Sequence, residues 1–247
     1  ALNGDTIEVR AGTYVENINF NGKQLLLSGE SAETTIIDGN WQERTVELNG
    51  QSTIQNFTIT RGDNAENSDR GSGMRITTSG ASVRNCIFTD NRGSGGGDHI
   101  KIGAANNVIV ENCQFFNNLS SEPLFADNGS EGGIYVNCFI DANGKGKVSG
   151  NGWPSFINCT IVNFTDSAYR CGGNGEAVLR NCIFVPAPEA DEAKVVDSDS
   201  FPFQILVEHC RVVGVQRNRS NENGASLTFG AGNITSDPLF VDAANGD

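Results

Sequence analysis

The sequence contains few residues that favour long helices and no long hydrophobic span. Its 247 residues include thirty Gly and six Pro, and only one Met. Gly tolerates positive φ and weakens helix interiors, so the composition indicates a β chain rich in turns. No apolar run approaches the roughly 20 residues needed to cross a bilayer, so we expect no membrane insertion. No linker-like stretch divides the chain, and we expect residues 1–247 to form a single domain.

Basic residues are also scarce. The chain carries 17 Lys and Arg against 30 Asp and Glu, a formal net charge of -13 at pH 7. Coulomb repulsion from phosphates therefore predicts that nucleic acid is not a partner. The seven Cys are too sparse for a disulfide scaffold. With no C-x-x-C pair and only two His, the sequence predicts no metal site of the zinc type.

One dipeptide, Asn-Cys, recurs through the middle of the chain. Six Cys follow one another at intervals of 21 to 28 residues, and five of them directly follow an Asn. The repeated positions are Asn85, Asn112, Asn137, Asn158 and Asn181, with Cys86, Cys113, Cys138, Cys159, Cys182 and Cys210. Apolar residues alternate around each pair, which is typical of a strand with one buried face. The Asn breaks this alternation, which predicts a sharp bend with left-handed φ at the Asn.

A repeat of this length, made of short strands and bends, predicts a solenoid in which each coil stacks on the next. Equivalent residues of neighbouring coils then lie about 4.8 Å apart. We therefore expect an internal ladder of Asn amides and a column of buried, free thiols. Cys171 lies outside this column, and two interpretations stay open for it: a small buried or turn residue, or a reactive thiol.

The two ends of the chain contain the most specific sequence motifs. The segments GDTIEVRAGTYVENINFNGKQLLLSGE (4–30) and TTIIDGN (34–40) resemble the first coils of right-handed parallel β-helix proteins of the pectate-lyase-like superfamily. GNITSDPLFVDAANGD (232–247) is similar to the closing segment of such repeat proteins in bacteria. The resemblance implies an all-β, single-stranded right-handed parallel β-helix of about eight or nine coils. Many members are secreted or surface-attached, which implies an extracellular or cell-surface location.

The same resemblance implies that an N-terminal cap and a C-terminal continuation lie outside this chain. The chain would then be a fragment with one or both ends of the stack exposed. Open strand edges invite pairing with another copy. End-to-end or edge self-association is therefore expected as a second kind of partnership, beside polysaccharide.

Three cationic side chains are the candidates for catalysis. If Met74, Ile76, Ile100 and Ile102 point inward, then Arg75, His99 and Lys101 point outward, with Asp98 beside them. In β-elimination of a uronic-acid polymer, Lys101 or His99 would serve as the base and Arg75 would hold the carboxylate. The alternative interpretation is a solvated face with chance cations.

A second outward row follows the Cys column and supplies the candidates for substrate binding. It holds Thr58, Ile87, Gln114, Phe139, Thr160, Ile183 and Arg211. Large apolar groups such as Ile87 and Phe139, together with Asp98, would stack on or bind sugar rings. Alternatively the chain's own residues 186–203 cover this row. Trp41 and Trp153 carry the same two interpretations, sugar stacking or packing.

Two acidic segments, residues 61–73 and 187–200, leave Ca²⁺ open as an alternative to ordinary solvated loops, and we otherwise expect no cofactor. Three functions remain in competition. The first is a secreted or surface module that interacts with extracellular polysaccharide without catalysis. The second is a polysaccharide lyase-like enzyme that uses Lys101, Arg75 and His99. The third is a purely architectural segment of a large surface protein. Whether the chain is an enzyme stays open.

Overall fold

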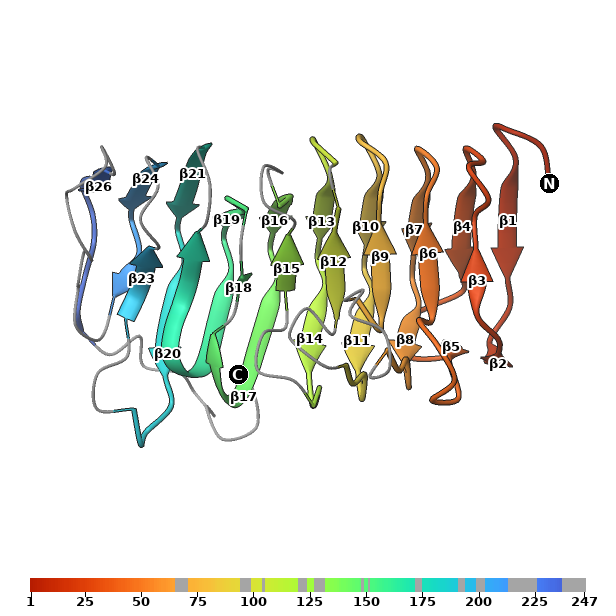
Figure 1. Cartoon of the computed structure of the whole chain (residues 1–247), viewed down its shortest axis with the longest axis horizontal. Helices are drawn as coiled ribbons and strands as arrows, with labels where there is room; N and C mark the ends of the chain where they lie inside the picture. Colours follow the sequence, from red (N-terminus) through yellow and green to blue (C-terminus); the bar gives the residue numbers. More distant parts are fainter. Residues whose placement is uncertain are drawn as a thin grey trace.

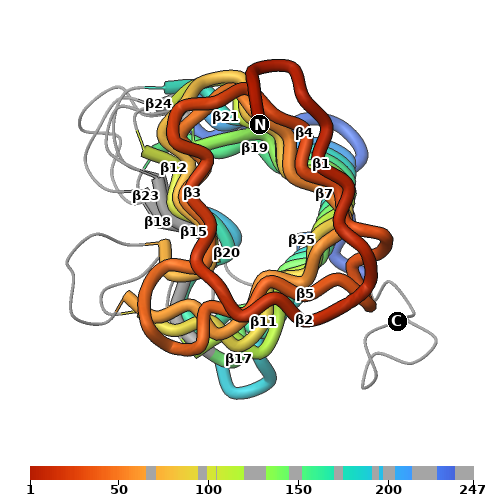
Figure 2. The backbone as a smooth tube through the Cα atoms, turned by 90° about the vertical axis from the view of Figure 1, so that its right-hand side faces the viewer, coloured from red at the N-terminus to blue at the C-terminus, as the bar shows by residue number. Residues whose placement is uncertain are grey.

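A computed structural model describes the chain except for residues 65–70, 94–98, 104, 120–123, 127–131, 148, 151, 172–174, 191–193, 199–202, 213–225 and 237–247. The described residues form strands and turns and contain no helix. The strands stack side by side along the long axis of a rod (Figure 1), and the view along that axis shows one coil lying behind another (Figure 2). All strand pairs within the three sheets are parallel, as in a β-helix.

Successive strands along the chain belong to three sheets, here named A, B and C. Sheet A contains β1 (Thr6–Val9), β4 (Leu26–Gly29), β7 (Thr53–Gln55), β10 (Ser82–Arg84), β13 (Ile109–Glu111), β16 (Ile134–Val136), β19 (Ser155–Ile157), β21 (Gly175–Arg180), β24 (Phe203–Glu208) and β26 (Ser226–Phe229). Sheet B contains β2 (Gly12–Val15), β5 (Thr35–Asp38), β8 (Thr58–Thr60), β11 (Ile87–Thr89), β14 (Gln114–Phe116), β17 (Phe139–Lys147), β20 (Thr160–Cys171), β22 (Ile183–Pro186) and β25 (Arg211–Val212), with β23 (Lys194–Ser198) beside β20. Sheet C contains β3 (Ile18–Asn19), β6 (Val46–Leu48), β9 (Met74–Ile76), β12 (Ile100–Ile102), β15 (Leu124–Ala126) and β18 (Ser149–Gly150).

The predicted fold class is confirmed, with a small difference in the number of coils. Among the described residues sheet A has ten strands and sheet C has six, so the described three-sided cross-section is complete in six coils. Beyond them, β20 is twelve residues long and pairs with both β22 and β23. The described part of residues 186–203 thus extends sheet B at β23.

Inward side chains of successive coils pack on one another and form the core. Phe88 and Phe115 are stacked, with ring centroids 4.9 Å apart, and Tyr135 lies 5.1 Å from Phe156. These four side chains are at most 1% exposed. Stacking of like residues follows from the parallel register, which sets Phe88 opposite Phe115 in neighbouring coils. The alternation seen in the sequence therefore marks the buried face correctly.

The bend between sheets A and B holds the predicted Asn ladder. Asn85, Asn112 and Asn137 have φ of 49°, 54° and 54°, in the left-handed region expected from the broken alternation. The side-chain amide Nδ2 of Asn112 donates to Oδ1 of Asn85 at 3.1 Å, and that of Asn137 donates to Asn112 at 3.1 Å. The ladder extends from Asn56 to Asn181. It was expected to be internal, but its members from Asn85 on are exposed, because the bend turns the side chain outward.

The residue after each Asn turns inward and forms the predicted thiol column. Cys86, Cys113, Cys138, Cys159, Cys182 and Cys210 are all free and at most 3% exposed. Each Sγ from Cys113 to Cys210 contacts a backbone carbonyl of the preceding coil, for example Cys159 Sγ to Tyr135 O at 3.4 Å. Burial raises the pKa of Cys113 well above its ordinary value. Hydrogen bonding to Cys138 and burial raise the pKa of Cys159 to about 12, so Cys113 and Cys159 stay protonated at neutral pH.

The bend between sheets B and C contains a second group of Asn that sequence reasoning did not find. Asn91 and Asn118 are 0% and 2% exposed. Asn118 Nδ2 donates to Phe88 O at 2.9 Å and to Phe116 O at 2.8 Å, and its Oδ1 accepts from the backbone amide of Asn91 at 2.8 Å. These side-chain amides form hydrogen bonds with backbone groups that cannot pair with a neighbouring strand at the bend.

Candidate functional site

The predicted cation cluster lies on sheet C, and its geometry departs from the expectation. Parallel pairing of β9 with β12 sets Lys101 opposite Arg75, as expected. Lys101, however, is only 8% exposed. The chain at Gly71 passes over it, since a Cβ placed on Gly71 would lie 2.7 Å from Lys101 Cβ. Arg75 is half-buried, with Nη1 3.8 Å from Glu47 Oε1.

His99 points into the core, so the expectation that it faces outward is wrong. It is 2% exposed, and its ring centroid lies 5.7 Å from that of Phe115. The described residues offer no hydrogen-bond partner to Nδ1 or Nε2. Burial lowers the pKa of His99 to about 3, so the ring is neutral at physiological pH. The error arose because β12 begins at Ile100 and the chain bends just before it, where strand alternation does not apply.

Two other predicted residues cannot be placed. Asp98 lies outside the described residues, and so does the side chain of Cys171. The acidic segments are also described only in part. Within the described ranges, no group of three or more His, Cys, Asp or Glu side chains is arranged to hold a metal ion. Calcium binding in these segments therefore stays a prediction.

The outward row on sheet B has the predicted register. We call Ile87, Gln114, Phe139, Thr160 and Ile183 the outer row. Consecutive members are direct partners in neighbouring strands from β11 to β22. Gln114 is exposed and the other four are half-buried. One coil earlier, Thr58 is covered by the turn at residues 30–34, because its hydroxyl donates to Ala32 O at 2.7 Å. Ile87 is therefore the first residue of the outer row beyond this turn.

A groove of about 240 Å³ lies where the outer row emerges. It is lined by Glu30, Ser31, Ala32, Glu33, Asn56, Asn85, Cys86, Ile87, Asn112 and Gln114. The turn supplies one wall, and the exposed Asn ladder supplies another. Between them lies the apolar side chain of Ile87, with the Gln114 amide one coil further on. The groove thus combines apolar surface with several amide donors and acceptors.

The ionised groups of the groove are acidic. Hydrogen bonds from its own backbone amide and from Ser31 lower the pKa of Glu33, so this exposed carboxylate is charged at neutral pH. Glu30 Oε2 accepts a hydrogen bond from the backbone amide of Ala11 at 3.0 Å, which fixes the side chain beside the wall. No Lys or Arg is among the described residues that line the groove. The ionised side chains that line the groove are therefore all negative.

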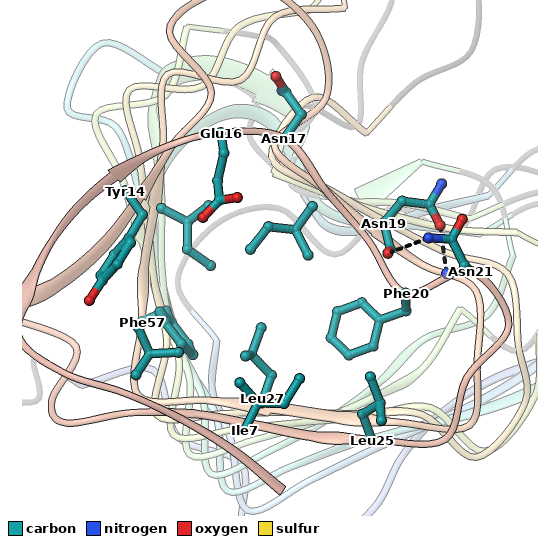
Figure 3. A pocket seen from close by; sticks show the side chains of 13 residues that line it. Ile7, Tyr14, Glu16, Asn17, Asn19, Phe20, Asn21, Leu25, Leu27 and Phe57 are labelled. Atoms are coloured by element: carbon teal, nitrogen blue, oxygen red, sulfur yellow. Dashed lines mark hydrogen bonds between the residues drawn. The ribbon is translucent and has the colours of Figure 1, made fainter. Parts of the chain in front are cut away.

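A larger pocket of about 540 Å³ opens at the first coil. Figure 3 shows Ile7, Phe20, Leu27 and Phe57 around it, with Glu16 and Asn17 at one side. It is the interior of the first coils seen from the end of the rod. Strands β1, β2 and β3 each pair on one side only among the described strands, with β4, β5 and β6. This end presents open backbone edges around an apolar hollow.

Both Trp residues contact the protein itself. Trp41 has φ of 58°, and the guanidinium carbon of Arg92 lies 4.8 Å from its ring centroid. Arg92 is in turn held by Asp63, with Nε 2.7 Å from Oδ2. Trp153 is half-buried, packs against the core and lies against the backbone at Gly175. Packing thus accounts for Trp153, and a cation–π contact holds one side of Trp41.

Comparison with known proteins places this geometry in a family. Residues 25–184 match the family model described as the right handed beta helix region. The chain belongs to the right-handed β-helix family. A search among curated protein sequences finds no match. The right-handed β-helix expected from the two ends of the chain is thereby confirmed.

Solved structures share this β-helix architecture at low sequence identity. A pectin methylesterase from Aspergillus niger is 14% identical over 94% of this chain and 78% of its own, with a TM-score of 0.52. A mannuronic acid specific polysaccharide family 6 lyase from human gut microbiota is 12% identical over 90% of this chain and 65% of its own, with a TM-score of 0.51. These likenesses show the fold. Within the described part of this β-helix no helix is long and apolar enough to span a membrane.

Proposed function

We propose that this β-helix protein is an extracellular or cell-surface module that binds polysaccharide along sheet B. The observation that supports this most is the groove at Ile87, which joins an apolar surface to a row of exposed amides. Sugar rings present C–H faces and hydroxyl groups, and so match such a mixture. The names of the two similar structures, which refer to pectin and mannuronic acid, agree with polysaccharide as the partner.

The outer row gives this site the length that a polymer needs. From Ile87 to Ile183 it advances by one strand spacing, about 4.8 Å, at each coil. Phe139 lies next to Gln114 in the row and would provide a second apolar contact for a chain that extends beyond the groove. Asp98, the remaining predicted binding residue, keeps that role as a prediction.

The lyase alternative has weaker support in this geometry. A base must contact the polymer, but His99 packs on Phe115 in the core and Lys101 is 8% exposed. Arg75 is already near Glu47. Incubation with polyuronates distinguishes the two functions, because elimination creates an ultraviolet-absorbing conjugated double bond. We expect no such rise in absorbance; a rise that Lys101→Ala abolishes would establish the lyase.

Binding is tested by affinity electrophoresis and calorimetry with a panel of neutral and acidic polysaccharides. We expect at least one ligand, and a loss of tenfold or more in affinity for Ile87→Asp, which places a charge in the apolar part of the groove. Leu119→Asp is the matched control, because Leu119 is 61% exposed and lies outside the outer row and the lining of the groove. Circular dichroism of each variant shows whether it folds. A panel without any ligand would favour the purely architectural role.

Self-association is the second partnership that we propose, and the pocket at the first coil supports it. Ile7 is 36% exposed and lines an apolar hollow bordered by open strand edges. A second copy would cover this surface and pair with those edges. Sedimentation velocity should show concentration-dependent association that Ile7→Asp reduces. Leu119→Asp again serves as control, and a monomer at every concentration would contradict the proposal.

A further inference from the structure

The charges and hydrogen-bonding groups of the groove point to one chemical class of glycan. We infer that the groove selects neutral, hydroxyl-rich polysaccharide over polyuronate. This inference rests on the proposed function and adds selectivity to it. It separates this chain from the pectin and mannuronic acid that the names of the similar structures mention.

The first support is the sign of the charge. Glu30 and Glu33 are exposed carboxylates in one wall, and the described lining contains no basic side chain. On the opposite side Arg84 precedes Asn85, but it is paired with Glu111, with Nε 3.6 Å from Oε2. A polyuronate carries a carboxylate on each sugar, so it would bring like charges together. A neutral glycan meets no such repulsion.

The second support is the hydrogen-bonding capacity of the ladder. Asn85 donates one N–H to Asn56 and accepts one bond from Asn112, while Asn112 donates to Asn85 and accepts from Asn137. An amide has two N–H donors and two acceptor lone pairs. Each exposed rung therefore keeps one donor and one acceptor for a ligand. A hydroxyl both donates and accepts, whereas a carboxylate only accepts, so the free pair on each rung matches hydroxyl groups.

The carboxylates complete this match. Glu33 is an acceptor with no proton at neutral pH, so it can bind only groups that donate, as sugar hydroxyls do. Charge-assisted hydrogen bonds of this kind are about twice as strong as neutral ones. Ile87 lies between the walls, where the C–H face of the same sugar would pack. The Glu33 carboxylate, the free amide groups of the ladder and the Ile87 side chain are thus complementary to groups that a neutral sugar presents.

The experiment measures binding of neutral glucans, galactans and xylans against polygalacturonate and alginate. Titrations are run at low and at high salt, with a chelator present to remove Ca²⁺ bridges. The test variant is Glu30→Gln/Glu33→Gln, in which the amide oxygen introduced at position 30 can still accept the Ala11 N–H. The control is Glu176→Gln/Glu189→Gln, which removes the same charge from two exposed positions outside the groove.

We expect wild-type protein to bind a neutral polysaccharide at least tenfold more tightly than any polyuronate. The test variant should gain affinity for polyuronate by about threefold to tenfold at low salt, and the control variant should not. Preferential binding of polyuronate, abolished by Ile87→Asp, would overturn the selectivity while leaving the proposed function in place. Absence of binding to every glycan would overturn both.

Discussion

At the bend between sheets A and B the ladder side chains from Asn85 to Asn181 lie at the surface and bond to one another, whereas at the bend between sheets B and C the side chains of Asn91 and Asn118 are buried and bond mainly to the backbone. Asn112 is exposed and donates to Asn85. Asn118 is 2% exposed and serves three backbone groups. The same residue type thus has two different roles: the ladder Asn residues combine a left-handed φ with surface amides, and Asn118 replaces missing backbone hydrogen bonds.

The largest effect should follow from removing a buried amide. In Asn118→Ala, one buried carbonyl, one part-buried carbonyl and one buried N–H lose their partners. Each unsatisfied group costs about 1–3 kcal/mol, so we expect a loss of about 3–5 kcal/mol in the free energy of unfolding, measured by urea denaturation. A loss below about 1 kcal/mol would show that the second bend does not depend on this side chain.

His99 offers a different test of the second bend, because it is polar and buried but has no hydrogen-bond partner among the described residues. Its pKa in the folded protein, about 3, is below the ordinary value of 6.5. The unfolded chain therefore binds more protons between these values, and stability must fall as pH decreases from about 6.5 towards 3. From pH 7 to pH 5 the His99 contribution is about 2 kcal/mol.

The variants His99→Phe and His99→Leu isolate this contribution. Other groups also titrate on acidification, but only the part due to His99 disappears in both variants. Urea denaturation at pH 7 and pH 5 should therefore show a smaller pH dependence in each variant than in the wild type, by about 2 kcal/mol. Equal dependence in all three proteins would mean that His99 reaches solvent in the folded state.

A smaller effect is expected at the first bend. Asn112→Ala removes the short polar side chain that lets Asn tolerate a φ of 54°, and it also removes exposed hydrogen bonds. The left-handed conformation costs about 1–2 kcal/mol, which sets the expected loss. Asn112→Gly retains the conformation and should change stability by no more than about 0.5 kcal/mol. If both variants lose equal stability, the amide ladder rather than the φ value stabilises this bend.

The two bends also differ in how far sequence could predict them. The first bend interrupts an apolar alternation and is followed by Cys, so its φ value and the thiol column were both predictable. The second bend has a weaker signal: Asn91 and Asn118 each lie six residues after a ladder Asn. That spacing could have revealed the buried pair. Whether each Asn faces water or the core depends on the turn geometry, which alternation does not encode.

The candidate site was predictable only where it lies on strands. The outer row follows directly from the Cys column because parallel register fixes which residues are neighbours. The wall at residues 30–34 comes from a preceding coil, and nothing in the repeat indicates that it covers Thr58 and leaves Ile87 accessible. His99 was misplaced for the same reason, since it precedes its strand. Loops and turns decide access, and their paths are set by contacts distant in the sequence.

The last prediction concerns reactivity at the first bend rather than stability. Exposed Asn112 is followed directly by Cys113, which is 1% exposed, so the boundary between solvent and core lies between adjacent residues. Thiol reagents attack the thiolate, and burial both blocks access and raises the pKa of Cys113. We therefore expect the six thiols of the column to react with Ellman's reagent only in denaturant. Cys171→Ser is the matched variant, and any fast thiol in the native wild type should vanish in it. A fast thiol that persists would show that the column opens to solvent and that the first bend does not seal the core.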